Sequence, residues 1–177
     1  MISIAIKTAA AVIAAAGLAY TSADDAAPGA AYGDENRLKS LTEDVLATHA
    51  QAVFQRADRD QNGALDNNEY ASLSIVSAEL ARLNGFIVIE SENGPATVAI
   101  SGHASSALSQ ADHVRIDAVA RSTFYLHAGN DGRMDENEYA TAQRAMFDGA
   151  DINGNGVLRR GELAVFAQRQ ALMTAGV

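Results

Sequence analysis

Oxygen-bearing side chains recur at one fixed spacing in two twelve-residue segments of this chain. Loop one, residues 58–69, has the sequence DRDQNGALDNNE, and loop three, residues 151–162, has the sequence DINGNGVLRRGE. In both segments, carboxylates or amides occupy positions one, three, five and twelve, and a glycine occupies position six. Such oxygens are hard ligands, and Ca2+ takes about six to eight of them at ~2.3–2.6 Å. The spacing therefore predicts two calcium sites.

Loop one offers the more acidic set of ligands. Every second side chain points into the loop, and Gly63 allows the backbone to turn around an ion. Glu69 would bind the ion through both of its carboxylate oxygens. The expected ligands are Asp58, Asp60, Asn62, the backbone carbonyl of Ala64, Asp66 (directly or through water) and Glu69. The alternative is a solvated acidic turn between two helices.

Loop three has fewer negative charges than loop one. Its expected ligands are Asp151, Asn153, Asn155, the backbone carbonyl of Val157, and Glu162. Loop three contains two carboxylates and two arginines, Arg159 and Arg160, whereas loop one contains four carboxylates and one arginine, Arg59. Affinity for Ca2+ follows the charge of the ligands, so we expect loop three to be the weaker site.

A third copy of the pattern keeps only its second half. Loop two, residues 127–138, ends in GRMDENE, which parallels GALDNNE in loop one, but His127 and Gly129 stand where the opening acids are expected. Measured from Phe124, it is also one residue shorter than loop one. We therefore interpret loop two as a structural copy with too few ligands for a tight site.

The full pattern D-x-[DN]-x-[DN]-G-x5-E, placed between predicted helices, resembles the EF-hand calcium-binding family. The resemblance covers about residues 40–83 and 109–173, and within the family the chain resembles small exported bacterial EF-hand proteins. It implies an all-α fold of helix–loop–helix repeats, with Ca2+ as the ligand. It also implies short two-stranded contacts between loops at position eight, which is Leu65, Met134 or Leu158 here.

The length of chain between the loops limits which of them can pair. If residues 139–150, between loops two and three, form one helix, its rise of ~1.5 Å per residue separates its ends by about 18 Å. Paired strands lie only ~4.8 Å apart. We therefore predict that Leu65 pairs with Met134, and that loop three pairs with a copy of itself in a dimer or stays unpaired. A break at Gly149 would weaken this argument.

Helices must position all three loops. Apolar periodicity and capping signals predict helices that begin at a Ser40–Glu43 capping box, at Tyr70, at Ser109, at Glu136 and at Arg160. Between the first and second repeats, residues 84–108 are predicted to hold a small β-hairpin of strands 86–90 and 96–100. Its apolar run is interpreted as hairpin core or, alternatively, as a strand that docks a partner. His49, on the apolar side of its helix, is interpreted as a core histidine.

Charge and composition exclude several functions. Thirteen basic residues against 22 acidic ones give a net charge of −9, which argues against nucleic-acid or anionic-membrane partners. The chain has no cysteine, and therefore no disulfide, thiolate metal site or cysteine nucleophile. The serines near His103 and His113 form no nucleophile motif, so we do not expect an enzyme.

The N-terminal residues resemble a targeting segment. Residues 1–23 contain Lys7, an apolar run and small residues at a cleavage position, as in a secretory signal peptide. A membrane anchor is the alternative, and cleavage would leave no membrane contact. Residues 24–39 are expected to form a flexible leader, followed by a first EF-hand (40–83), the hairpin insertion and the remaining hands (109–177). We expect an exported protein, periplasmic or secreted.

Two roles for calcium binding are compatible with the sequence, a structural or buffering role and a sensor role. Few methionines remain after residue 23, so the adaptable Met-rich groove of many sensors is absent. We therefore expect a structural or buffering role. The alternative is a sensor that exposes an apolar surface to a protein target. The sequence leaves open both a protein target and self-association.

Overall fold

The computed structural model describes residues 36–100 and 106–173. The described chain is mainly helical, which confirms the coarse fold class. Its helices are α1 (Glu43–Ala57), α2 (Asn67–Asn84), α3 (Gln110–His127), α4 (Glu136–Ala150) and α5 (Arg160–Met173). Three antiparallel strand pairs accompany them: β1 (Ser40–Thr42) with β6 (Val157–Arg159), β2 (Ala64–Leu65) with β5 (Met134–Asp135), and β3 (Phe86–Ile89) with β4 (Ala96–Ala99).

The helix boundaries follow from the capping residues. Asp66, Ser109 and Asp135 cap α2, α3 and α4, each in a capping box with the acid three residues later. The predicted start of the second helix, Tyr70, was therefore too late, because Asp66 satisfies the first amides of α2. The capping box expected at Ser40 is wrong. Thr42 caps α1 instead, accepting from the Val45 amide, because Ser40–Thr42 form a strand.

The loops pair as predicted in one case and not in the other. Leu65 lies opposite Met134 in the β2–β5 pair, which confirms the pairing of loops one and two. Loop three was expected to pair with a second copy or with nothing, and that prediction is wrong. Leu158 lies opposite Leu41, because the segment before α1 forms a strand that fills the partner position within the same chain.

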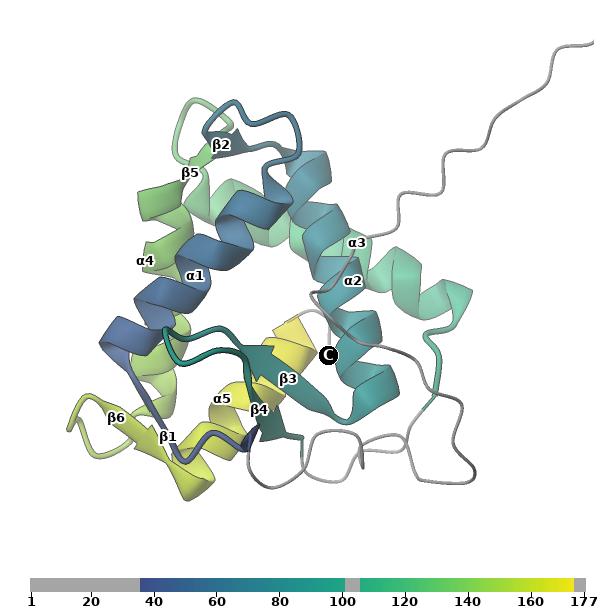
Figure 1. The fold of residues 1–177 in the computed structure, drawn as a ribbon. Coiled ribbons are helices and arrows are strands. Elements are labelled where there is room, and N and C mark those ends of the chain that lie inside the picture. The colour runs from purple at the N-terminus through teal and green to yellow at the C-terminus, as the bar shows by residue number, and fades with distance from the viewer. Residues whose placement is uncertain (1–35, 101–105, 174–177) are drawn as a thin grey trace, which may run out of the picture.

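Two units of equal length build the centre of the molecule. Leu41 and Leu65 are 24 positions apart, as are Met134 and Leu158, and the helix between each pair, α1 or α4, has 15 residues. Gly149 lies inside α4 and does not break it. In Figure 1, α1 and α4 run side by side between the two strand pairs, with β2 and β5 at one end and β1 and β6 at the other. Loops one and two therefore lie at one end of the helix pair and loop three at the other.

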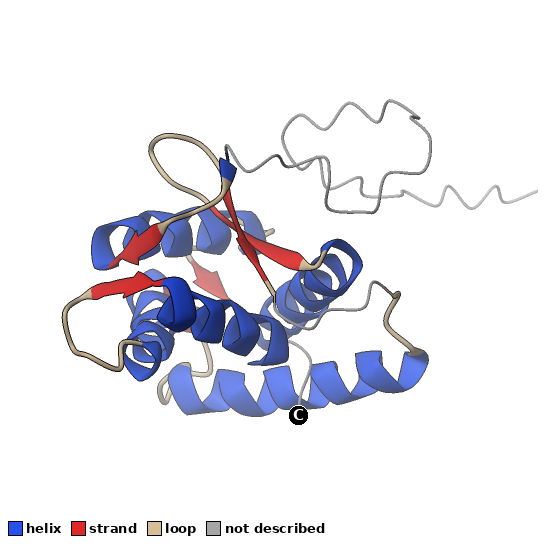
Figure 2. Ribbon diagram, turned by 90° about the horizontal axis from the view of Figure 1, so that it is seen from below, coloured by secondary structure: helices blue, strands red, loops and turns tan. Residues whose placement is uncertain are grey.

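Each end has its own apolar core. The core beneath β1 and β6 is centred on buried side chains from the strands, the hairpin and the last two helices: Leu41, Ile89, Val98, Phe147, Leu158 and Phe166. The core beneath β2 and β5 is built from Phe54, Leu65, Phe124, Met134 and Tyr139. Figure 2 shows the crossed strands of the hairpin between helices. Burial of Ile89 and Val98 supports the interpretation of the hairpin as core.

The predicted signal peptide lies outside the described residues, as does the leader up to residue 35. At the end of the leader, the Leu38 amide donates to the Thr97 carbonyl at 2.9 Å, so the chain contacts the hairpin before it enters β1. Among the described helices, none combines the length and the apolar character needed to cross a membrane.

Candidate metal site

Three carboxylates of loop one converge within the loop. Asp58 is the C-cap residue directly after α1, Asp60 follows two residues later, and Glu69 lies in the first turn of α2. One oxygen from each lies within 4.8 Å of the other two. Two oxygens bound to the same Ca2+ are separated by at most about twice the ~2.3–2.6 Å bond length. The three side chains can therefore share one metal ion.

Backbone amides of the loop hold these carboxylates in place. Asp58 accepts from the amides of Asn62 (3.1 Å) and Gly63 (2.9 Å), and Glu69 accepts from those of Arg59 (2.8 Å) and Asp66 (3.0 Å). Asp58 and Glu69 are each only 9% exposed. Gly63 has a φ of +82°, so its lack of a side chain lets the loop turn here. The loop thus aims negative oxygens inward while its amides point at them.

The other expected ligands of loop one are placed differently. The Asn62 side-chain nitrogen, Nδ2, donates to Asp60 Oδ2 at 2.7 Å, which ties two candidate ligands together. Ala64 lies in β2. Asp66 is outside the close group of three, since its Oδ1 caps α2 by accepting from the amides of Asn68 and Glu69. Asp66 therefore has a structural task at the helix end in addition to any contact with an ion.

The first acid of loop three repeats the hydrogen bonds of Asp58 in loop one, whereas the closing glutamate has other partners. Asp151 is the C-cap residue of α4 as Asp58 is of α1, and it accepts from the amides of Asn155 (3.2 Å) and Gly156 (2.8 Å). Glu162 accepts from the Asn153 side chain and, at 3.4 Å, from its amide. Val157 lies in β6. Loop three thus repeats the backbone hydrogen bonds of its first acid and brings Asn153 to Glu162, with two carboxylates where the close group of loop one has three.

The exit from loop three lacks the cap found in the other two loops. Position nine is Asp66 in loop one and Asp135 in loop two, and both cap the following helix. In loop three it is Arg159, whose side chain has no acceptor. The next residue, Arg160, has a φ of +43°, which is unfavourable for a residue with a side chain. Loop three is therefore less well held at its end as well as less charged.

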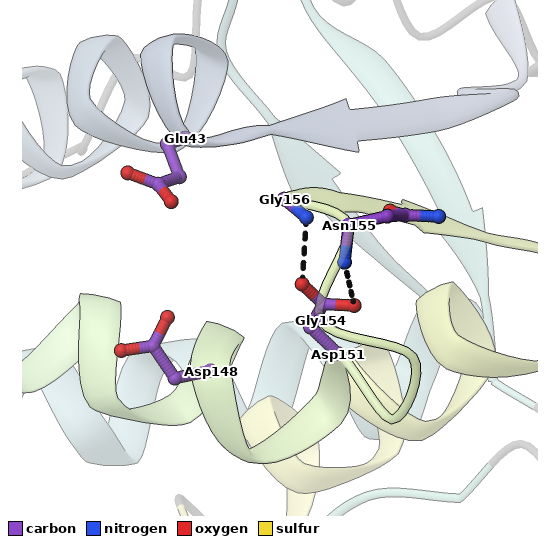
Figure 3. Close-up of a pocket in the computed structure, with 6 residues that line it drawn as sticks. All are labelled: Glu43, Asp148, Asp151, Gly154, Asn155 and Gly156. Carbon is purple, nitrogen blue, oxygen red and sulfur yellow. Dashed lines mark hydrogen bonds between the residues drawn. The ribbon is translucent and has the colours of Figure 1, made fainter.

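Two further acids lie beside loop three that the sequence analysis did not identify. Glu43, from the first turn of α1, and Asp148, from the last turn of α4, line an open hollow together with Asp151, Gly154, Asn155 and Gly156. Figure 3 shows both carboxylates next to the loop, pointing toward one another. Glu43 also pairs with Arg144 at 2.6 Å. Arg144 balances the charge of Glu43, so Asp148 is the acid that adds negative charge near a loop that is itself neutral in sum.

Loop two lacks the first ligand position. Three buried phenylalanines align the loops. The backbone carbonyl of each accepts a hydrogen bond from the backbone amide four residues later: Phe54 from Asp58, Phe124 from Ala128, and Phe147 from Asp151. Ala128, not His127, therefore stands where the first acid stands in the other loops, which corrects the assignment made from the sequence. Glu138 still forms the capping box with Asp135.

His49 lies on α1 outside the loops and contacts the hairpin. Its Nδ1 accepts the Glu90 amide at 3.2 Å, and the Glu90 carboxylate pairs with Arg56 at 2.7 Å. Burial, followed by the nearby Arg56 charge, lowers the pKa of His49 to about 4. The side chain is therefore neutral at pH 7 and joins α1 to the hairpin, in line with the predicted structural role.

The fold and the site define a mainly helical protein in which one acidic loop can hold a metal ion. No protein-family model matches the chain, and no curated protein matches it.

Proposed function

We propose that the protein binds calcium through two EF-hand-like helix–loop–helix units, with the tighter site in loop one and the weaker in loop three. The observation that carries the proposal is the convergence of Asp58, Asp60 and Glu69 within a loop that joins two helices. The matching hydrogen bonds of Asp58 and Asp151 support the assignment of loop three as a second site.

Calcium is the metal that suits these ligands best. All candidate ligands are oxygens, whereas zinc and copper sites in proteins use mostly nitrogen and sulfur. Mg2+ demands a near-ideal octahedron and keeps several waters. A loop that supplies carboxylates, an amide and a backbone carbonyl from one short segment fits the larger and less rigid coordination of Ca2+. Mg2+ is accordingly expected to bind loop one more weakly than Ca2+.

We further propose that bound calcium serves a structural or buffering role. The position-eight residues Leu65, Met134 and Leu158 are fully buried in two cores that are already packed. A sensor would instead open one of these cores toward a target when Ca2+ binds. Fluorescence of a hydrophobic dye separates the two roles: we expect it to be the same with calcium and with chelator, whereas a strong calcium-dependent increase would favour the sensor.

Export is proposed from residues 1–23. The predicted signal peptide suits a protein that works outside the cytoplasm, where calcium is plentiful. Expression of the full chain in a bacterial host, followed by fractionation and N-terminal sequencing, tests this. We expect the periplasmic or secreted product to begin at Asp24. A full-length product retained in the membrane fraction would instead support the anchor.

The calcium proposal is tested by titration of three proteins. The wild type is expected to bind two ions in two phases. Glu69→Gln should remove the tighter phase, and Glu162→Gln the weaker one, because each substitution removes the carboxylate that closes its loop while keeping its size. Loss of the tighter phase in Glu162→Gln would show that the order of affinities is reversed. No calcium binding by the wild type would refute the function.

A further inference from the structure

An arginine from loop two contacts a candidate ligand of loop one. The Arg133 guanidinium, through Nη2, donates a hydrogen bond to Oδ1 of Asn62. The β2–β5 register brings the two residues together, because it places Leu65 opposite Met134 and so sets the backbone of Arg133 beside that of loop one. The paired strands of the two loops lie at one end of the molecule in Figure 1.

The hydrogen-bonding capacity of the Asn62 oxygen is already used. An amide oxygen has two lone pairs, and this one accepts from Arg133 and from the Ala64 amide at 3.0 Å. A cation bound to the same oxygen therefore has to displace one of the two donors. The bond from Ala64 belongs to the turn of the loop itself, because loop three has its counterpart between the Val157 amide and Asn155 Oδ1 at 2.9 Å. Arg133 is thus the donor that must leave.

We propose that Arg133 competes with the metal ion for Asn62 and weakens calcium binding at loop one. This inference rests on the proposed function and adds a residue that sets the affinity of its tighter site. Two effects act in the same direction. The guanidinium occupies the ligand oxygen, and its permanent positive charge opposes a second cation beside it.

The strand that pairs with loop three has no arginine at the matching position. In this strand, β1, Leu41 lies opposite Leu158 as Met134 lies opposite Leu65. The residue before Leu41 is Ser40, and the residue before Met134 is Arg133, so the two occupy equivalent positions. Serine carries no charge. The difference in affinity between the two loops is therefore smaller than their carboxylates alone would make it, and removing Arg133 should widen it.

The experiment compares Arg133→Gln with Arg59→Gln in the full chain. Both substitutions remove one positive charge at loop one, but only Arg133 donates to Asn62. Calcium affinity is measured by competition with a chromophoric chelator in 20 mM and 500 mM KCl. Through-space effects of exposed charges are largely screened at the higher salt. We expect Arg133→Gln to bind calcium at loop one about threefold to tenfold more tightly at low salt and still about threefold more tightly at high salt. Arg59→Gln should lose its effect at high salt.

A second readout follows the contact directly. In NMR spectra without calcium, the Asn62 side-chain amide signals of Arg133→Gln should be shifted from those of the wild type. When the wild type is titrated with calcium, its Arg133 Hε signal should move in step with the tighter phase. The weaker, Glu162-dependent phase should be unchanged in Arg133→Gln, which shows that the variant is folded.

Three results bear against parts of this account. Equal effects of the two substitutions at both salt concentrations would overturn the competition, as would an Arg133→Gln variant that binds no tighter than the wild type. Absence of a Glu69-dependent phase in the wild type would instead refute the proposed function itself, so the two failures are distinguishable.

Discussion

Leu41 lies directly opposite Leu158 across the β1–β6 pair, in the same arrangement that places Leu65 opposite Met134 across β2–β5. All four side chains are fully buried. Because α1 begins at the first pair and ends at the second, and α4 runs between the same two pairs, each candidate site is anchored in its own core. The two helices, which pack against each other, connect the sites.

Truncation of Leu41 tests the strand partner of loop three. Leu41→Ala removes a fully buried side chain and should lower the free energy of unfolding by about 2–5 kcal/mol in urea titrations. Leu80→Ala is the control, because Leu80 is 52% exposed, and its effect should stay within about 0.5 kcal/mol. Equal, small effects of the two substitutions would mean that β1 does not pack against β6 as described.

His49 should make stability depend on pH. Its pKa is about 4 in the folded protein and 6.5 in the unfolded chain, so between these values the unfolded chain binds more protons. The contribution is fully present above pH 6.5 and is lost as the pH falls toward 4. At ~1.4 kcal/mol per pKa unit, it amounts to about 3 kcal/mol.

Substitution of His49 isolates this effect from the many carboxylates. His49→Gln keeps an acceptor for the Glu90 amide but does not titrate. Urea unfolding in chelator at pH 7 and pH 4.5 should show the wild type losing about 2–3 kcal/mol more than the variant. Parallel losses in both proteins would show that His49 is already protonated, or is exposed, in the folded state.

Calcium should stabilise the fold. Binding to the native state alone adds about 2.7 kcal/mol at a hundredfold excess of ligand over Kd, which for a chain of this size corresponds to a rise in Tm of roughly 5–11 °C. The measurement is thermal unfolding with calcium and with chelator. The double variant Glu69→Gln/Glu162→Gln is the control and should melt at the same temperature in both. A wild-type Tm that does not respond to chelator contradicts the prediction.

Features encoded locally were predictable from the sequence. The helix cap at Ser109, the helix start at Glu136 and the hairpin each depend on neighbouring residues, and all are present in the structure. The pairing of Leu65 with Met134 was predictable as well, since a continuous helix of known rise cannot bring loops two and three together.

The features that were missed depend on contacts between distant segments. A three-residue strand at Ser40–Thr42 has no periodicity of its own, and its serine and threonine equally suggest a helix cap. The signal that was available is the shared 24-residue spacing of Leu41–Leu65 and Met134–Leu158. Glu43 and Arg133 approach other loops only once the strand registers are set, so no local pattern could have identified them.

The central claim is that loop one is the tighter of two calcium sites, and titration calorimetry of wild type, Glu69→Gln and Glu162→Gln tests it most directly. The account predicts two ions per wild-type chain, with the tighter phase lost in Glu69→Gln and retained in Glu162→Gln. A wild-type chain that releases or absorbs no heat with calcium and shows no change in Tm, or a tighter phase that survives in Glu69→Gln, would contradict it.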